Sequence, residues 1–157
     1  MQKIAPFLWF DGQAEEAMNF YVSIFQNSKV NNVMRCGDAG PGPKGSVLGV
    51  NFTLDGVDFH AINGGPVFQF SQAISFFVNC ETQLEVDQLW EKLSAGGEQQ
   101  QCGWLKDKFG VSWQIIPTIL GKLLGDKDSG KAGRAMQAMM QMTKIDIAGL
   151  QRAADQK

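Results

Sequence analysis

The stretch Lys106–Pro117, K-D-K-F-G-V-S-W-Q-I-I-P, predicts a tight turn that leads directly into a buried strand. The turn is centred on Gly110, because glycine tolerates the positive φ values that such turns require. In the strand that follows, Val111–Ile116, alternate side chains point to opposite faces, so Ser112 and Gln114 share one face. Burying an amide without a hydrogen-bond partner is costly. We therefore expect Gln114 to have a polar partner.

A faint internal repeat appears when the sequence is shifted by 69 positions against itself. Phe7-Leu8-Trp9 then falls on Phe76-Phe77-Val78. Further on, the matched pairs are Glu16 with Glu85, Ala17 with Val86, Phe20 with Leu89, Tyr21 with Trp90 and Ile24 with Leu93. The last four of these pairs are apolar or aromatic and have helical spacing. Each copy is therefore expected to contain a strand followed by an amphipathic helix.

The remaining elements follow from turn and capping signals. In the first copy we expect a helix over 14–25 with Asp11 as its N-cap, and strands over 3–10, 29–36, 47–54 and 57–62. Asp55-Gly56 between the last two strands is a hairpin signal. In the second copy we expect strands over 74–80, 98–105 and 111–116, and a helix that begins at a Thr82–Glu85 capping box and ends before Gly96-Gly97.

After Pro117 the pattern becomes helical. We expect a short helix over Thr118–Leu124 and a longer one over 131–154, which Asp146 could divide by capping a new turn. The longer segment carries an apolar stripe made of Met136, Met140, Thr143, Ile147, Leu150 and Ala154. Such a stripe either covers the protein's own core, packs across a dimer or offers a methionine-rich surface to another partner.

Composition excludes several classes of protein. The chain has 157 residues and a formal net charge of −2, without the basic stripe of a nucleic-acid binder. No apolar run approaches the roughly 18 residues that cross a membrane, and the N-terminus lacks an apolar secretion signal. The three cysteines, Cys36, Cys80 and Cys102, are scattered, which favours reduced thiols in a cytoplasmic protein.

Four motifs carry a resemblance to a known family: P-F-L-W-F-D-G-Q-A-E-E-A-M-N-F-Y at the start, H-A-I-N-G-G-P, I-S-F-F-V-N-C, and G-W-L-K-D-K-F-G-V-S-W-Q-I-I-P. Over residues 1–120 the chain resembles the vicinal oxygen chelate superfamily of glyoxalases, bleomycin-resistance proteins and extradiol dioxygenases. Within it, the chain is similar to the PhnB-like, or 3-demethylubiquinone 3-methyltransferase-like, branch. The resemblance implies an α+β fold of two βαβββ modules, 1–65 and 66–117, whose cupped mixed sheets share one domain with a helical extension, 118–157.

In metal-dependent members of this superfamily, four His, Glu or Gln ligands come from the first and last strands of the two modules. The corresponding positions here fall near Ile4, Ala5 or Pro6, at Ala73, Ile74 or Ser75, at Gln114 and, with an uncertainty of one residue, at His60. Only His60 and Gln114 are weak candidate metal ligands, because alanine and serine bind divalent metals poorly or not at all. The chain therefore departs from the metal-dependent pattern, and we expect no cofactor apart from a weakly held divalent metal at most.

The expected function is binding of a small organic molecule in an apolar and aromatic sheet cavity. Its pocket residues would be Trp9, Phe76, His60, Asn63 and Gln114, with the last three as polar groups. The alternative is a lyase, isomerase or dioxygenase with a weakly held metal. Methyl transfer is not expected, because the chain shows no glycine-rich turn for S-adenosylmethionine. We also expect a homodimer, because many relatives pair and the extension carries an apolar stripe.

Overall fold

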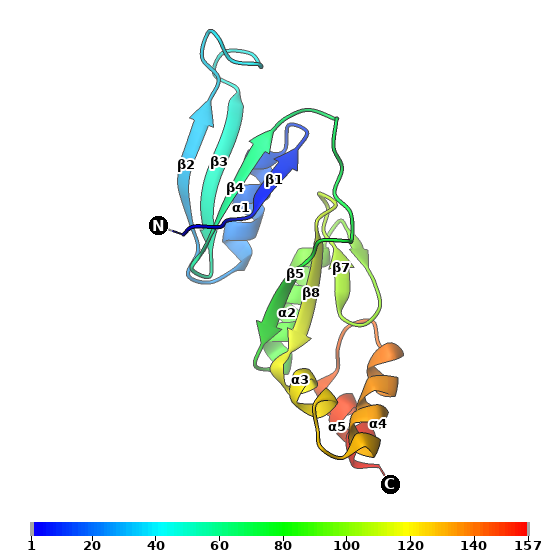
Figure 1. The fold of residues 1–157 in the computed structure, drawn as a ribbon. Coiled ribbons are helices and arrows are strands. Elements are labelled where there is room, and N and C mark those ends of the chain that lie inside the picture. The colour runs from blue at the N-terminus through cyan, green and yellow to red at the C-terminus, as the bar shows by residue number, and fades with distance from the viewer. Residues whose placement is uncertain (1, 157) are drawn as a thin grey trace. The chain divides into compact units, whose positions relative to one another are not determined.

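A computed structural model describes residues 2–156 of the chain. The chain divides into two compact units, residues 1–70 and residues 71–157, and the helical extension belongs to the second unit. Each unit contains one four-stranded sheet (Figure 1). No helix within residues 2–156 is long and apolar enough to cross a membrane.

The first unit consists of β1 (Phe7–Phe10), α1 (Ala14–Ile24), β2 (Lys29–Arg35), β3 (Val47–Leu54) and β4 (Val57–Asn63). The sheet order is β1-β4-β3-β2, with β1 parallel to β4 and the other pairs antiparallel. The β3–β4 hairpin turns at Asp55 and Gly56, whose φ values of 46° and 81° confirm the expected hairpin. The first strand begins later than the expected Lys3, because residues 3 and 4 bend and Pro6 has no N–H to donate to a sheet.

The second unit repeats this arrangement with β5 (Phe76–Cys80), α2 (Gln83–Ser94), β6 (Glu98–Gln99), β7 (Trp104–Lys106) and β8 (Ser112–Pro117). The sheet order is β5-β8-β7-β6, again with the first strand parallel to the last. The two helices α1 and α2 begin 69 residues apart, so the internal repeat is confirmed. The strand expected over 98–105 is wrong as a single element, because Cys102 and Gly103 turn the chain with φ values of 61° and 82°.

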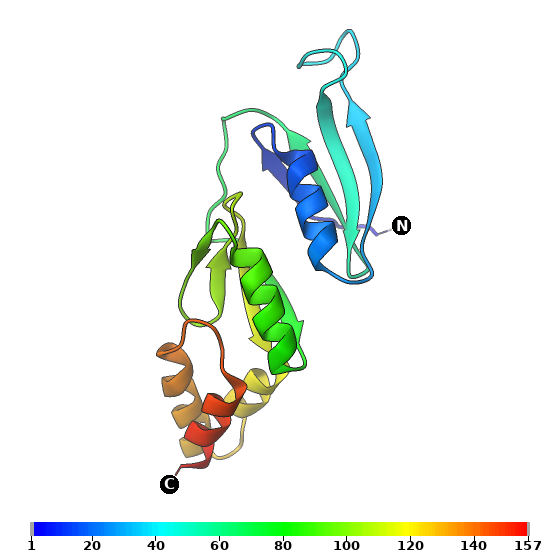
Figure 2. The same cartoon turned by 180° about the vertical axis from the view of Figure 1, so that it is seen from behind.

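One helix covers one face of each sheet (Figure 2). In the first unit, Leu8, Phe10, Phe52 and Phe59 are buried on the same side as the apolar residues of α1. The alternation of side chains sends Phe7, Trp9, Asn51, Asp58 and His60 to the other side, which we call the open face of the first sheet. Phe7 is 61% exposed there. The polar residues of the hairpin therefore gather on the face that α1 leaves uncovered.

The C-terminal extension folds as α3 (Thr118–Leu124), α4 (Ser129–Met140) and α5 (Ile147–Asp155). Its core joins the end of β8 to all three helices through Ile116, Leu120, Leu123, Ala135, Ile145, Leu150 and Ala154. The alternative in which this stripe covers the protein's own core is wrong for Met136 and Met140, which are 40% and 54% exposed. The chain leaves the helix between residues 141 and 146, so burial follows the contacts among three helices rather than one continuous helical spacing.

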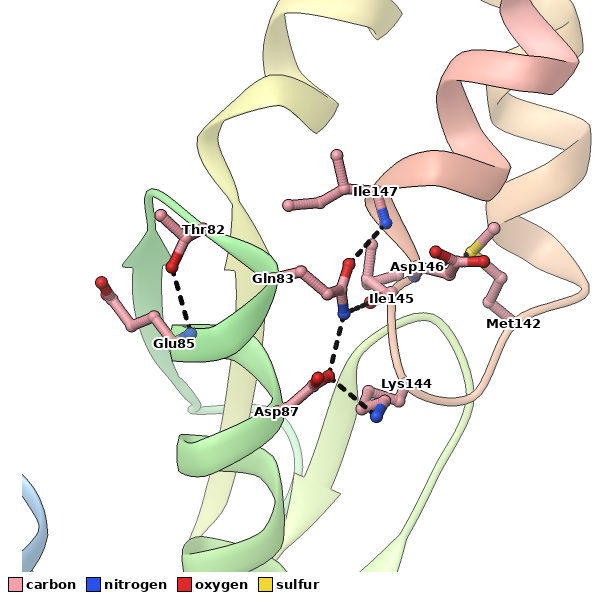
Figure 3. A network of polar contacts seen from close by, with 9 residues as sticks. All are labelled: Thr82, Gln83, Glu85, Asp87, Met142, Lys144, Ile145, Asp146 and Ile147. Atoms are coloured by element: carbon pink, nitrogen blue, oxygen red, sulfur yellow. Dashed lines mark hydrogen bonds and ion pairs between the residues drawn. The ribbon is translucent and has the colours of Figure 1, made fainter.

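A side-chain network ties this extension to α2 (Figure 3). Gln83 Oε1 accepts a hydrogen bond from the backbone N–H of Ile147 at 2.7 Å, which satisfies a free donor at the start of α5. Gln83 Nε2 donates to the carbonyl of Ile145 at 3.0 Å and to Asp87 Oδ1 at 2.9 Å. Lys144 Nζ lies 2.8 Å from the same Asp87 oxygen. Hydrogen bonds from Lys144 and Gln83 hold the pKa of the Asp87 carboxyl below its ordinary value.

Candidate ligand-binding site

His60 lies on the open face of the first sheet between two fixed neighbours. Strand pairing places it opposite Phe7 on β1 and opposite Asn51 on β3. The Asn51 side-chain Nδ2 donates a hydrogen bond to His60 Nδ1. Because an amide NH₂ can only donate, Nδ1 is the acceptor and the neutral ring carries its proton on Nε2. The Phe7 ring stacks beside the imidazole with a centroid distance of 5.9 Å and an interplanar angle of 10°.

A second set of polar contacts runs across the same face. Asn31 Nδ2 donates to Thr53 Oγ1 at 2.9 Å, and the Thr53 hydroxyl donates to Asp58 Oδ1 at 2.6 Å. Gln2 forms two hydrogen bonds of 3.0 Å with the backbone of Asp58, one to its carbonyl and one from its N–H. The side-chain amide of Gln2 thereby pairs with the Asp58 backbone as a neighbouring strand would, and it fixes the position of Asp58.

Most of these residues line a cavity of about 380 Å³. Its polar lining consists of Gln2, Asn31, Asn32, Asn51, Asp58 and His60. Sequence reasoning selected only His60 from this set. The signal for Asn51 and Asp58 was present in the hairpin, because a two-residue turn at Asp55-Gly56 places Thr53 opposite Asp58 and Asn51 opposite His60.

Trp9 and Asn63, two of the expected pocket residues, support the local backbone. Trp9 Nε1 donates to the carbonyl of Gly65 at 2.9 Å, and its ring meets the edge of Phe68 at a centroid distance of 4.9 Å. Asn63 Oδ1 accepts from the N–H of Ala14 at 2.9 Å. Asn63 therefore satisfies the start of α1, a role that the sequence had assigned to Asp11, which instead lies two residues before the N-cap position.

Phe76 and Gln114 lie in the second unit, on opposite faces of its sheet. Phe76 pairs with Trp113 on β8 and packs against that ring at a centroid distance of 5.2 Å, on the side with the buried residues. Gln114 is on the other side, where its Nε2 donates to Ser75 Oγ at 2.9 Å. The expectation that Gln114 needs a polar partner is confirmed. The expected grouping of Phe76 with Gln114 is wrong, because the strand register separates them.

The donor set does not fit a tightly held divalent metal. Ala5 lies in the cavity beside His60, and Ser75 contacts Gln114, so each unit pairs the two positions that the superfamily resemblance relates. These four positions offer one imidazole, one amide, one hydroxyl and one methyl group, without a carboxylate. Within residues 2–156, no group of three or more His, Cys, Asp or Glu side chains is placed to hold a metal ion.

Cys80 is not an activated nucleophile. All three thiols are free, and Cys80 is buried. Burial, with the nearby carboxylates of Glu85 and Glu81, raises the pKa of the Cys80 thiol to about 12. The thiol rather than the thiolate is therefore present at neutral pH, and the thiolate is the reactive form.

Solved structures define the class of protein to which this fold belongs. A PhnB protein from Bacillus cereus, provisionally named 3-demethylubiquinone-9 3-methyltransferase, is 41% identical, with a TM-score of 0.69, and the match covers 74% of this chain and all of that chain. Protein PA1353 from Pseudomonas aeruginosa is 22% identical with a TM-score of 0.62, over 74% of this chain and 98% of that one. The fosfomycin resistance protein FosX from Listeria monocytogenes, in complex with Mn(II) and sulfate, is 17% identical with a TM-score of 0.53, over 72% and 90%. The chain shares the glyoxalase-like fold of these proteins, and the two matches under 25% identical show a likeness of fold alone.

The chain belongs to one particular family of proteins with this fold. Residues 2–116 match the model of the 3-demethylubiquinone-9 3-methyltransferase family, and the chain therefore belongs to this PhnB-like family. The matched region ends just before α3, so the helical extension lies outside it. No curated protein matches the chain.

Proposed function

We propose that this protein binds a small organic molecule in the cavity beside His60 and does so without a tightly held metal. The observation that carries the proposal is the fixed position of the His60 ring at a cavity of about 380 Å³. Asn51 orients this ring through a hydrogen bond, and the Phe7 ring stacks against it. Small-molecule sites are concave and place a few polar groups precisely. This cavity has both properties.

The character of the cavity differs from the sequence-based expectation. An apolar and aromatic cavity was expected, whereas six of the eight residues that line this cavity carry amide, carboxylate or imidazole groups. Phe59 also lines the cavity, but its ring stacks on Phe52 with the centroids 5.4 Å apart, and the Trp9 ring packs against Phe68. A ligand for this site is therefore expected to form hydrogen bonds rather than to rely on apolar contact alone.

Binding can be tested by NMR with a library of small organic fragments. Fragments that occupy the cavity are expected to shift the side-chain amide signals of Asn51 and the ring signals of His60. The variant Asn51→Ala should weaken such binding about tenfold, the effect of losing one hydrogen bond and the orientation of the ring. Asn79→Ala is the matched control, because Asn79 is exposed in the second unit. A library in which no fragment shifts the cavity signals would refute the proposal.

The alternative function is a lyase, isomerase or dioxygenase with a weakly held divalent metal at His60 or Gln114. Elemental analysis of protein purified without a tag separates the two functions. We expect less than stoichiometric Zn, Ni, Fe or Mn, because the superfamily positions supply only one strong ligand. Stoichiometric metal that disappears in His60→Ala would instead favour the enzyme.

The family name does not by itself bring methyl transfer to this chain. A methyl donor such as S-adenosylmethionine is commonly held by a glycine-rich turn between a parallel strand and a helix. Here β1 and α1 are joined by Asp11-Gly12-Gln13, which contains a single glycine. We therefore place ligand binding ahead of methyl transfer.

We also propose that the protein is a cytoplasmic homodimer. The supporting observations are three free thiols and large apolar side chains on the surface, among them Phe7, Phe77 and Met140, each more than half exposed. Apolar surface of this kind is often buried between subunits. Light scattering at micromolar concentration should give twice the chain mass of 17.2 kDa, and a monomer would contradict the dimer. Cell fractionation tests the compartment.

A further inference from the structure

In the His60 cavity, Asn31 and Asn51 each use one N–H of the side-chain amide for a hydrogen bond within the protein. Asn31 donates to Thr53, and Asn51 donates to His60. The Oδ1 atoms of both asparagines accept no hydrogen bond from the residues that the structure describes. Both residues line the cavity. Each asparagine therefore offers a ligand an unoccupied carbonyl oxygen as an acceptor, in addition to the second N–H of its amide.

Asp58 adds a carboxylate to these acceptors. Its Oδ1 accepts the Thr53 hydroxyl, whose own oxygen accepts from Asn31, so this relay is polarised toward the carboxylate. Its backbone groups are both occupied by Gln2. Among residues 2–156, Asp58 Oδ2 has no hydrogen-bond or ion-pair partner.

The cations of the first unit do not neutralise this carboxylate. The unit contains four Lys and Arg residues. Arg35 pairs with Glu15 at 3.5 Å, and Lys44 pairs with Asp38 at 3.3 Å. The other two, Lys3 and Lys29, are exposed, and neither lines the cavity nor forms an ion pair with Asp58 in the described part of the chain.

We propose that the ligand of this cavity carries a protonated amine or guanidinium group, which binds against Asp58, Asn31 and Asn51. This inference rests on the proposed ligand-binding function and adds the chemical class of the ligand. A cation with several N–H donors matches one charged and two neutral acceptors, and charge-assisted hydrogen bonds are the strong ones. The His60 Nε2–H and the Asn32 amide remain for a second polar group of the same molecule.

The same chemistry argues against an anionic ligand. Phosphonate and carboxylate groups are held in proteins by arginine, lysine or rows of backbone N–H groups. The polar lining of this cavity contains no lysine or arginine and does contain the Asp58 carboxylate. An anion placed there would face like charge without a compensating cation.

Three probes with the same phenylethyl-type body separate the possibilities: 2-phenylethylamine, 2-phenylethanol and phenylacetate, titrated into the full-length protein and followed by NMR. We expect all binding to be followed through the Asn31 and Asn51 side-chain signals. The dissociation constant of the amine should be at least tenfold lower than that of the alcohol, and the acid should not bind. Asp58→Asn should weaken the amine about tenfold, the scale of one charge-assisted hydrogen bond. Asp55→Asn is the matched control, because it removes the same charge in the adjacent turn, where asparagine tolerates positive φ.

The outcomes distinguish this inference from the function on which it rests. If the alcohol or the acid binds the cavity as well as the amine does, the cavity binds ligands but the inference is wrong. If Asp58→Asn and Asp55→Asn weaken the amine equally, the effect is general electrostatics, and the inference is also wrong. Micromolar Mn(II) that broadens the His60 signals and displaces the amine would show that the acceptors serve a metal instead. If neither these probes nor the fragment library shift any cavity signal, the proposed function itself fails.

Discussion

Replacing Asp107 with asparagine is expected to lower the free energy of unfolding by about 3 kcal/mol, since it breaks a buried, charge-assisted network. Asp107 is only 2% exposed. Its Oδ1 accepts from the N–H groups of Phe109 and Val111 at 2.9 and 3.0 Å, and its Oδ2 accepts from Trp113 Nε1 at 2.9 Å. Asparagine has one acceptor oxygen and one NH₂ group, so one of its ends would face a donor with another donor.

Urea denaturation followed by tryptophan fluorescence measures this loss. Asp38→Asn is the matched control, because the Asp38 side chain is 88% exposed and its pairing with Lys44 lies on the surface. Surface ion pairs of this kind contribute little, so the control should stay within about 0.5 kcal/mol of the wild type. An Asp107→Asn protein that unfolds at the wild-type urea concentration would show that the turn does not depend on the carboxylate.

Gly97→Ala is expected to have an effect of similar size, at least about 3 kcal/mol, through steric conflict. A Cβ at this position would lie 2.1 Å from the carbonyl oxygen of Lys106 and 2.8 Å from the carbonyl carbon of Asp107. Both are backbone atoms, and the neighbouring residue Glu98 pairs with Lys106 between β6 and β7. The backbone cannot move away without breaking that pairing.

Gly133→Ala is the control for the change from glycine to alanine itself. Gly133 lies inside α4, and an added Cβ there meets no atom within 4 Å. Alanine is a better helix former than glycine, so this variant should gain up to about 1 kcal/mol. Thermal unfolding of both variants gives opposite shifts if the explanation is steric. A loss of stability in both would mean that the second unit tolerates no added methyl group for some other reason.

Local signals in the sequence were sufficient for much of the fold. Asp55-Gly56 fixed a hairpin whose register follows by counting outward from the turn. The same count places Asn51 opposite His60, so the pairing that orients the imidazole could be predicted from the sequence alone. The helix that starts after Thr82 could also be predicted, because its cap is local: the Thr82 hydroxyl accepts a hydrogen bond from the N–H of Glu85 at 3.2 Å, within one turn.

Other features depend on residues that are distant in the sequence. The cap of α1 comes from Asn63, and no local pattern connects that side chain with Ala14. The break between α4 and α5 is similar, because Gln83, more than 60 residues earlier, satisfies the first N–H of α5. The cavity also needs Gln2 and Asn31, which lie on different segments and meet only when the sheet has formed.

The backbone contacts of residues 102 and 103 bear on where this chain can be shortened. The N–H groups of Cys102 and Gly103 donate to the carbonyls of Met142 and Thr143, both at 2.8 Å. The region shared with the PhnB-like family stops at residue 116. A truncated protein designed from that family boundary would leave two strand-turn amides unsatisfied and strip the cover from Ile116. The final forty residues are thus part of the folding unit of the second sheet, and an expression fragment should retain them.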